Sequence, residues 1–381
     1  MDFSLTEEQR LILKTVKEIC NKEFSPKAQE VGRSSCFPWE NVKRLATYDL
    51  MGVPIPEEYG GLGKDFLTWV LIGEELSFSC TTTGAIFGAN MLCIYPIYMF
   101  GNEQQKRKYL VPLARGECLG AFALTEPDAG SDAAGIRTTA TRDGMEYVLN
   151  GTKAFITNGG EADIYVVIVK TRLERGARGM SAFIVEKGTP GFTFGKSEDK
   201  MAYPGLANRE LVFSDCRVSH DNILLQEGRG FRVAMETLDL GRIGMGAGAV
   251  GLARRAAEEA VKYSKQRVQF GSPISSFQAI QFYLADMATE IEAARLLVLK
   301  AANMRDKGEE FSGIAAMAKL YASEVAMRVV NKATQIHGGY GYIKDYPVER
   351  YFREAKLFEI VEGTSEIQRN VIANYVLKTV Q

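Results

Sequence analysis

The hydrophobic pattern divides the chain into three regions, and the first extends to about residue 120. There the apolar residues Ile12, Val16 and Ile19 recur at helical spacing, and Ser4 or Thr6 can cap the helix that they predict. Further helices are predicted over residues 66–79, 84–100 and 104–113. The first region is therefore expected to be an all-α domain covering residues 1–120.

The second region, residues 121–228, changes to strand character. Short β-branched or aromatic runs are separated by glycine, aspartate and asparagine, which is typical of strands joined by tight turns. These runs are YVLNG (147–151), DIYVVIVK (163–170), MSAFIVEKG (180–188) and RELVFSDC (209–216). We expect a small β-barrel or sandwich here.

The third region, residues 229–381, returns to long helices. Helical periodicity covers 275–305, 313–336 and 364–379, and the glycines of 338–342 interrupt it. Long helices with short links predict a helix bundle. The order of a helical domain, a strand domain and a helical domain places two junctions along the chain, and ligand sites favour such junctions.

Composition excludes several classes of function. The chain has 381 residues and a formal net charge of −1, so nothing favours a nucleic-acid or membrane partner. No apolar run approaches the length of a membrane span, and the N-terminus is polar, so we expect a cytoplasmic protein. The six cysteines form no C-x-x-C pair, and there are only two histidines. We therefore expect neither a disulfide framework nor a metal site.

The segment IVEGTSEIQRN (360–370) is the strongest candidate for chemistry. Glu362 precedes Gly363, which permits a tight turn, and small hydroxyl residues follow at the start of a predicted helix. A carboxylate in that position could act as a base. The alternative is an ordinary acidic residue that the helix dipole favours in a first turn.

Four other segments place polar or aromatic side chains beside glycines. The turn at Gly130, Ser131 and Asp132 could hold phosphate or carbonyl oxygens, and Phe155 should share a strand face with Thr157. The remaining two segments are 238–251, with Asp239 and Arg242 one helical turn apart, and 267–281, with Arg267, Phe270 and Gln278. Each has an ordinary alternative, namely a surface turn, a core strand, tight helix packing or a solvated link.

Together, and in this order, the motifs of the chain resemble the acyl-CoA dehydrogenase family of flavoproteins. The resemblance covers essentially the whole chain and includes IPEEYGGLG, FALTEPDAGSD, NGTKAFITNGG, RVQFGSPISSFQAIQ, QIHGGYGY and VEGTSEIQRN. Short-chain, butyryl-CoA-like members are the most similar, through KDYPVERYFREAKL (344–357). The resemblance implies a helical domain over 1–120, a β-barrel over 121–228 and a four-helix bundle over 229–381.

The resemblance also implies FAD in the cleft between barrel and bundle. One group of matching positions would contact the flavin: Phe122, Leu124, Thr125, Gly130, Ser131, Phe155, Ile156, Thr157, Thr364 and Glu366. A second group would come from a neighbouring subunit to the adenine and diphosphate: Arg267, Phe270, Gln278, Gln335, Gly338 and Gly339. A homotetramer made of two dimers is the implied assembly.

In the family, Glu362 matches the catalytic base. It would take the α-proton of an acyl-CoA while a hydride leaves Cβ for flavin N5, which yields a trans-2-enoyl-CoA, and electrons would pass to an electron-transfer flavoprotein. Positions that match the surroundings of the acyl-CoA are Ser131, Leu238, Asp239, Arg242, Val361 and Gly363. An oxidase, an enoyl-CoA reductase and a non-catalytic acyl-CoA or flavin-binding protein are the alternatives.

Three departures from the family pattern bear on the substrate. Val361 stands where an aromatic residue usually precedes the base, Phe155 replaces a frequent tryptophan, and 200–213 differs from the common strand sequence. The volume freed at Val361 leads us to expect tolerance of a branched, cyclic or aryl acyl group. No arginine in 81–90 is placed to hold a distal carboxylate, so glutaryl-CoA is not the expected substrate.

Overall fold

The computed structural model describes residues 5–379. Its N-terminal part is helical, with α1 (Glu7–Ile19), α2 (Ala28–Val31), α3 (Trp39–Thr47), α4 (Phe66–Ser79), α5 (Thr81–Phe100), α6 (Glu103–Gln105) and α7 (Val111–Arg115). Thr6 caps α1 in a reciprocal pair with Gln9, as its hydroxyl accepts from Gln9 N–H and the Gln9 side chain accepts from Thr6 N–H. The other predicted cap, Ser4, lies outside the described residues.

Helices α4 and α5 are apolar on nearly every side because both are buried. The prediction of 66–79 is confirmed, and α5 begins at Thr81, three residues before the predicted start. By length and composition alone α5 could cross a membrane, so the prediction that no apolar run approaches the length of a membrane span is wrong for this segment. It packs against α4, α8 and β1, however, so burial inside the protein accounts for its composition.

The middle region forms a single sheet. Its strands are β1 (Gly120–Ala123), β2 (Thr139–Asp143), β3 (Glu146–Thr157), β4 (Ile164–Lys170), β5 (Met180–Glu186), β6 (Phe192–Ser197), β7 (Asn208–Ser219) and β8 (Ile223–Leu224). They pair in the order β6-β7-β3-β2-β4-β5-β8, and β1 pairs with β4.

The predicted barrel needs one correction, because the sheet is not closed. Within residues 5–379 the end strands β6 and β8 do not pair with each other. One half of the sheet consists of β6, β7, β3 and β2, and the other half contains β4, β5 and β8. The halves are joined at a single register pair, Thr139 of β2 with Lys170 of β4, because β2 pairs along its length with β3. The C-terminal end of β3 carries the predicted cofactor residues Phe155, Ile156 and Thr157.

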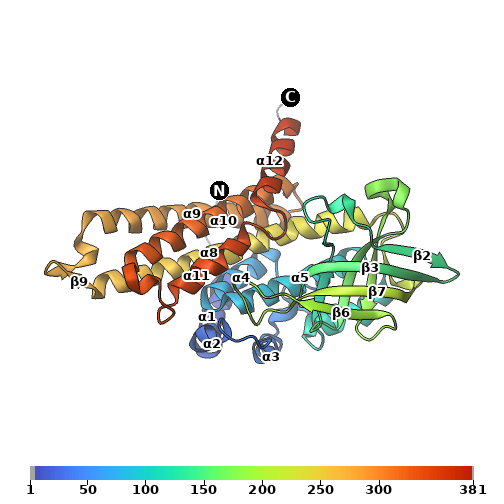
Figure 1. The fold of residues 1–381 in the computed structure, drawn as a ribbon, viewed down its shortest axis with the longest axis horizontal. Helices are drawn as coiled ribbons and strands as arrows, with labels where there is room; N and C mark the ends of the chain where they lie inside the picture. Colours follow the sequence, from blue (N-terminus) through green and yellow to red (C-terminus); the bar gives the residue numbers. More distant parts are fainter. Residues whose placement is uncertain (1–4, 380–381) are drawn as a thin grey trace.

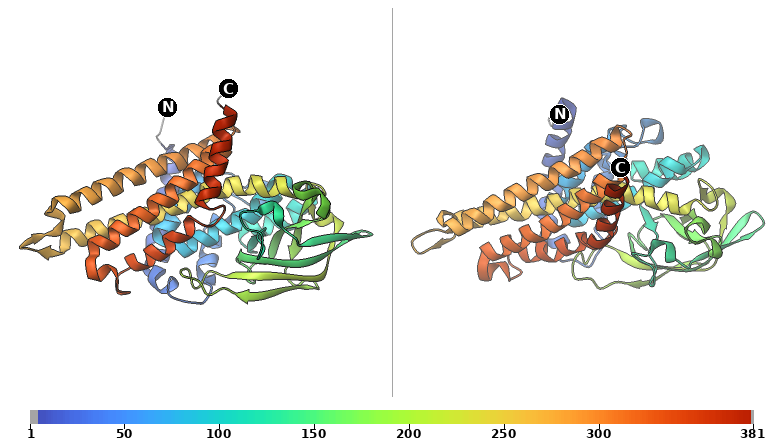
Figure 2. Two further views of the ribbon diagram at one scale, coloured as in Figure 1. Left: turned by 45° about the horizontal axis from the view of Figure 1, so that its top comes forward. Right: turned by 90° about the horizontal axis from the view of Figure 1, so that it is seen from above.

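The C-terminal part is the predicted bundle. It contains α8 (Gly230–Gln266), the hairpin β9 (Val268–Gln269) and β10 (Ser272–Pro273), α9 (Gln278–Asp306), α10 (Ser312–His337), α11 (Val348–Phe358) and α12 (Ser365–Thr379). Figure 1 shows α8, α9, α10 and α11 running alongside one another, with the β9–β10 hairpin at the end farthest from the sheet. Helix α12 stands away from the body in that view and in the left view of Figure 2, whereas in the right view, seen from above, it lies over the body.

Helix α8 connects the three parts of the molecule. It packs against α4 and α5 from the N-terminal part, against α9 and α10 in the bundle, and against β5 of the sheet. Its glycines permit this close approach, since a Cβ at Gly251 would lie 2.2 Å from the carbonyl oxygen of Glu74. The segment predicted to pack tightly, 238–251, lies in the middle of this contact.

Candidate functional site

The site is built around the turn between α11 and α12. Glu362 has φ 54° and Gly363 has φ 96°, so two consecutive residues have left-handed backbone. Glycine adopts this conformation freely, but a glutamate in it costs roughly 1–2 kcal/mol. Such strain is retained where surrounding contacts fix it, and it is common at functional positions.

Three side-chain hydrogen bonds fix this turn. Lys319 Nζ of α10 donates to the carbonyl oxygen of Gly363 at 2.7 Å. The Gln368 amide of α12 donates to the carbonyl oxygens of Glu362, at 3.1 Å, and Gly363, at 2.9 Å. The backbone adds a bond from Ser365 N–H to Glu359 O at 3.0 Å. Neither Lys319 nor Gln368 was among the predicted site residues.

The turn directs the carboxyl group of Glu362 onto the surface of α8. A Cβ added to Gly241 would lie 2.0 Å from Glu362 Oε2 and 2.8 Å from Leu92 Cδ2, so only glycine fits there. Glu362 Oε2 is buried and has no hydrogen-bond partner within residues 5–379. An unpartnered carboxylate oxygen is unusual in a protein interior and marks a group that is available to a ligand.

The charge of this carboxyl is poorly solvated. Burial raises the pKa of Glu362 to about 7, although the positive charges of Lys319 and Arg242 act in the opposite direction. Burial also lowers the pKa of Lys319 to about 8, against the attraction of Glu362. A carboxyl with a pKa near neutrality can accept a proton and release it again.

The predicted substrate residues of α8 lie beside this carboxyl. Asp239 accepts hydrogen bonds from Arg242, in close contact, and from Ser312 Oγ at 2.9 Å. Desolvation raises the pKa of Asp239 in spite of the neighbouring guanidinium of Arg242. Leu238 and Val361 are half-buried. The structure thus brings the residues predicted from 238–242 and 361–363 into one cluster.

A second group of predicted residues lies where β1 meets β3. Phe122 is on β1, Leu124 and Thr125 follow it, and the N–H of Ala154 donates to Thr125 O at 2.9 Å. The expected alternation of Phe155 and Thr157 on one strand face is interrupted, because a bulge falls between Lys153 and Ile156 and Phe155 has φ 57°. Phe155 is nevertheless 59% exposed, although phenylalanine is usually buried.

A buried ion pair supports this group and was missing from the predicted site. Lys153 Nζ lies 2.7 Å from Glu126 Oε1 and donates to Leu124 O at 2.9 Å. Glu126 also accepts from the N–H groups of Arg137 and Thr138. Beside this pair, Ser131 is exposed and a Cβ at Gly130 would meet no atom of the described residues within 4 Å, so the 130–131 turn is open to a ligand.

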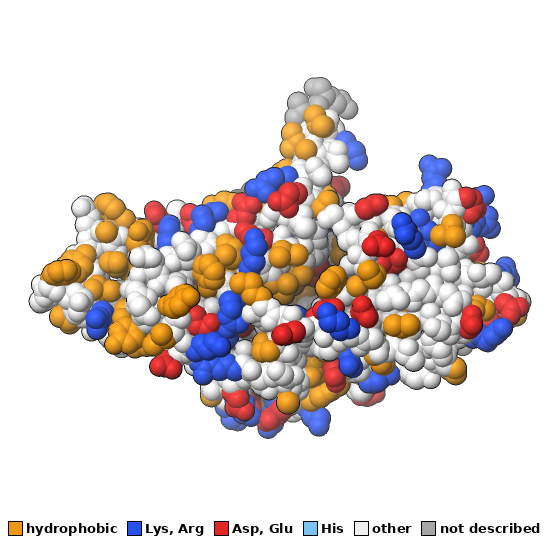
Figure 3. Space-filling view, viewed as in Figure 1, with side chains coloured by type: hydrophobic (Ala, Val, Ile, Leu, Met, Phe, Trp, Pro, Cys, Tyr) orange, Lys and Arg blue, Asp and Glu red, His pale blue; other side chains and the backbone are white. Residues whose placement is uncertain are grey.

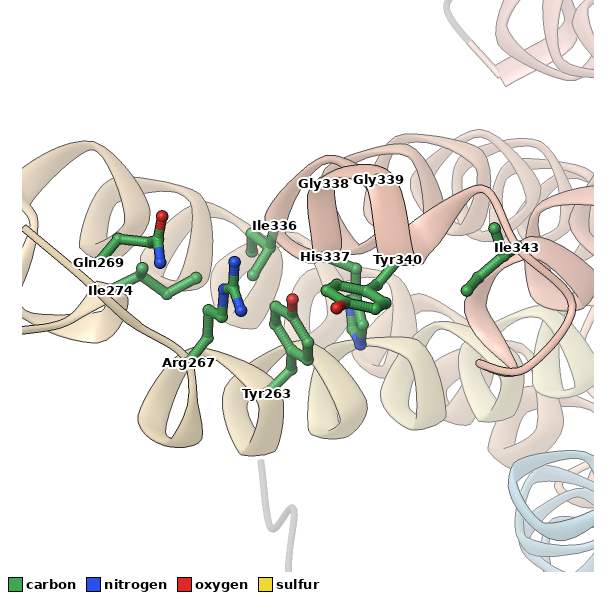
Figure 4. A pocket seen from close by; sticks show the side chains of 10 residues that line it. All are labelled: Tyr263, Arg267, Gln269, Ile274, Ile336, His337, Gly338, Gly339, Tyr340 and Ile343. Atoms are coloured by element: carbon green, nitrogen blue, oxygen red, sulfur yellow. The ribbon is translucent and has the colours of Figure 1, made fainter.

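The third group lies at the far end of the bundle. Arg267 and Tyr263 rise from α8 towards the turn at Gly338–Tyr340 and border a hollow of about 590 Å³ (Figure 4). The Arg267 guanidinium lies 5.6 Å from the centre of the Tyr340 ring. Phe270, at the hairpin, is 97% exposed, and hydrophobic side chains gather over this end in Figure 3.

The second and third groups do not meet within one chain. Figure 1 shows β9 and β3 at opposite ends of the molecule. Gln278 and Gln335 are exposed, and Gly338 and Gly339 have room for a Cβ, so this end is also open to a ligand. Thr364 and Glu366 directly follow the Glu362 turn in the chain. Thr364 Oγ1 accepts from Ile367 N–H at 3.4 Å, and Glu366 is exposed.

Three family models match the chain in the order of its three parts. They describe the N-terminal, middle and C-terminal domains of acyl-CoA dehydrogenases, and they match residues 6–117, 121–216 and 228–377. The chain belongs to the acyl-CoA dehydrogenase family. Members of this family are flavin-dependent oxidoreductases.

Individual acyl-CoA dehydrogenase relatives cover almost the full length. The chain is 50% identical to "Acryloyl-CoA reductase (NADH)" of Anaerotignum propionicum, over 99% of this chain and 96% of that one. It matches the butyryl-CoA dehydrogenase structure of Megasphaera elsdenii with a TM-score of 0.97 and 48% identity, covering 99% and 100% of the two chains. A chain from a structure described as the electron transferring flavoprotein of Acidaminococcus fermentans gives a TM-score of 0.98 and 51% identity, covering 99% and 100%.

Proposed function

We propose that the protein is an FAD-dependent acyl-CoA dehydrogenase in which Glu362 removes the α-proton of a short acyl-CoA, leaving a trans-2-enoyl-CoA. The observation that carries this proposal is the buried, unpartnered Glu362 Oε2 with its raised pKa. FAD, held by Phe155, Thr157 and the 130–131 turn, would supply the oxidising chemistry by which the hydride of Cβ is removed.

The α-proton of a thioester is too weakly acidic for an isolated carboxylate, so the developing enolate must be stabilised. In this turn the N–H groups of Val361 and Ser365 donate hydrogen bonds to backbone carbonyl oxygens. The N–H of Glu362 donates no backbone hydrogen bond within residues 5–379. This N–H is therefore free to donate to the thioester oxygen. Because it belongs to the base itself, one turn positions both the donor and the proton acceptor.

The residues of the second and third groups fit a long, flat cofactor with a diphosphate. Phe155 exposes a ring next to Thr157, and the glycines at 130, 338 and 339 have no neighbour where a Cβ would be. Since these groups are far apart in one protomer, we infer that a second subunit brings its hairpin to the sheet of the first. A tetramer made of two such dimers is the assembly that we propose.

Packing around α8 supports a short acyl chain. One turn beyond Gly241, a Cβ at Gly244 would lie 2.9 Å from Trp69 Cη2, so the indole fills this space. Trp69 stacks on Phe66 and Phe87 with ring centres 5.0 and 5.1 Å away. Val361 beside the base is half-buried, and we propose that its small side chain leaves room sideways. We therefore propose a pocket that is shallow but wide enough for a branched, cyclic or aryl group.

The direction of the reaction and the electron acceptor depend on the partner. The relative named acryloyl-CoA reductase favours a second candidate function, in which the same site reduces an enoyl-CoA. Glu362 would then donate the α-proton, which its pKa near neutrality also permits. The similarity to a chain from an electron-transferring flavoprotein structure supports such a flavoprotein as the electron partner.

One experiment tests the reaction class. The purified protein is mixed anaerobically with butyryl-CoA, hexanoyl-CoA and cyclohexanecarboxyl-CoA while the visible flavin band is followed. Rapid bleaching, with the corresponding enoyl-CoA as product, is the expected result. The proposal fails if the protein binds no flavin after reconstitution, or if no acyl-CoA bleaches it. The rate at which crotonyl-CoA oxidises the reduced protein is then compared with the rate at which an electron-transfer flavoprotein oxidises it. This comparison separates the two directions.

A further inference from the structure

Lys319 is the one lysine of α10 that points into the catalytic turn, and its side chain is fully buried. Burying an ammonium group is costly unless a partner compensates. Its hydrogen bond within the described chain is to a neutral carbonyl oxygen, that of Gly363. A buried lysine with only a neutral hydrogen-bond partner needs an explanation beyond ordinary packing.

The charges around Lys319 show which ionisable group its ammonium group affects most. Glu362 is the carboxylate with the strongest attraction for Lys319, and Glu359 at the end of α11 and Glu366 of α12 contribute less. Arg242 of α8 is the other cation near Glu362, but it is paired with Asp239. The field of Arg242 is therefore partly neutralised, whereas Lys319 has no ion-pair partner among residues 5–379 and acts on Glu362 with its full charge.

We propose that Lys319 is a positioning residue with two separable effects on the base. Its hydrogen bond to Gly363 O holds the left-handed turn, and its positive charge favours the ionised form of Glu362. This inference rests on the proposed function, since it concerns the group that removes the α-proton. Gln368 shares the first effect but is uncharged, so it holds the two carbonyl oxygens of the turn without acting on the charge of the carboxylate.

Four variants separate the two effects. Lys319→Met removes the hydrogen bond and the charge, Lys319→Gln keeps a donor without the charge, and Lys319→Arg keeps both. Gln368→Leu removes hydrogen bonds and leaves the charge. Lys332→Met is the matched control, because Lys332 is also on α10 but pairs with Asp286 of α9, away from the turn.

The readout is the acid limb of the pH profile of flavin bleaching by saturating butyryl-CoA. Loss of an adjacent positive charge raises the pKa of a carboxyl by about one unit or more. We therefore expect Lys319→Met and Lys319→Gln to move the acid limb upwards by roughly one pH unit. Lys319→Arg, Gln368→Leu and Lys332→Met should leave it in place. A displaced turn in Lys319→Met and Gln368→Leu should lower the maximal rate by roughly 10- to 100-fold.

A second readout does not use turnover. The infrared band of the protonated carboxyl, assigned by its loss in Glu362→Gln, reports the pKa of Glu362 directly and should move with the acid limb. If Lys319→Met does not assemble, Lys319→Gln carries the charge test alone. The inference is overturned if the limb and band of Lys319→Gln coincide with those of the wild type, or if Gln368→Leu moves them equally. If none of the acyl-CoAs bleaches the flavin of the wild type, the proposed function fails instead.

Discussion

The turn at Glu362 and the hairpin at Phe270 are both strained, but they differ in everything around them. Glu362 and Phe270 have φ of 54° and 49°. Side chains from α10 and α12 bond to the first turn and α8 packs beneath it, whereas the ring at the hairpin is 97% exposed. The contacts that position the base therefore come from one protomer, whereas we propose that a partner subunit covers the hairpin. Substitutions in the turn should therefore affect the rate of the reaction, whereas substitutions in the hairpin should affect FAD binding.

The largest effect is expected at the base. Glu362→Gln keeps the shape of the side chain but cannot accept a proton, so the rate of flavin bleaching by butyryl-CoA should fall by about 10²–10⁴-fold. The protein should remain yellow and assembled, because the hairpin is untouched. Anaerobic stopped-flow absorbance with a flavin count per subunit measures both properties. Retention of the wild-type rate would remove Glu362 from the mechanism.

A smaller loss is expected when the base is moved rather than replaced. Gly241→Ala would place a methyl group 2.0 Å from Glu362 Oε2, which forces the carboxyl aside. A displacement of about 1 Å costs roughly 100-fold in rate. Gly246→Ala is the control on the same helix, since its methyl group would lie 2.9 Å from Val298 Cγ2 and does not meet Glu362. Equal rate losses in the two variants would show that general damage to α8, and not the base, was measured.

At the hairpin the change should affect cofactor binding and leave the chemistry intact. Phe270→Ala removes an exposed ring, and the loss of stacking should weaken FAD binding by about tenfold. The rate per bound flavin should stay within about twofold, since Glu362 is distant. Titration of the apoprotein with FAD, with sedimentation of the product, checks this. Val268→Ala removes apolar atoms from the same hairpin without removing a ring, and it should bind FAD normally.

Stability should depend on pH through the base. The pKa of Glu362 is about 7 in the folded protein and about 4.3 in an unfolded chain, so the folded state binds more protons between these values. Its contribution therefore favours folding at low pH and is lost as pH rises towards 7, by at most about 4 kcal/mol. The melting temperature of the wild type relative to Glu362→Gln should be higher at pH 5.5 than at pH 8. A constant difference would contradict the raised pKa.

The smallest effect is expected on chain-length preference. Trp69→Phe removes the ring edge that covers Gly244, so the rate with hexanoyl-CoA relative to butyryl-CoA should rise by a few-fold, about 1 kcal/mol for added methylene space. Trp39→Phe is the control, because the other tryptophan is exposed and bonds to Glu161. An unchanged ratio would mean that the acyl chain does not reach Trp69.

Local patterns were sufficient for much of the fold. The bounds of α4 and the cap at Thr6 follow from neighbouring residues in the chain, and so they could be predicted. Closure of the sheet could not, because it depends on pairing between distant strands. The motif around Glu362 identified the base, but its left-handed backbone carries no sequence signal, since such residues are usually glycine.

Contacts between distant segments explain what was missed at the site. Lys319 bonds to a residue 44 positions away, and a lysine on a long helix is normally read as solvent-exposed. The available signal was its position within the apolar run GIAAMAKLYA, where a buried face was already expected. The contact of Gly241 with Glu362 likewise depends on the packing of α8, which no local pattern specifies.

The most direct test of the central claim uses butyryl-CoA deuterated at Cα. If the carboxyl of Glu362 removes the α-proton, bleaching of the wild-type flavin should slow severalfold with the deuterated substrate, and its rate should rise with pH about a midpoint near 7. A rate that is unaffected by α-deuteration and by pH across this range, under conditions where flavin reduction itself is observed, would contradict the account.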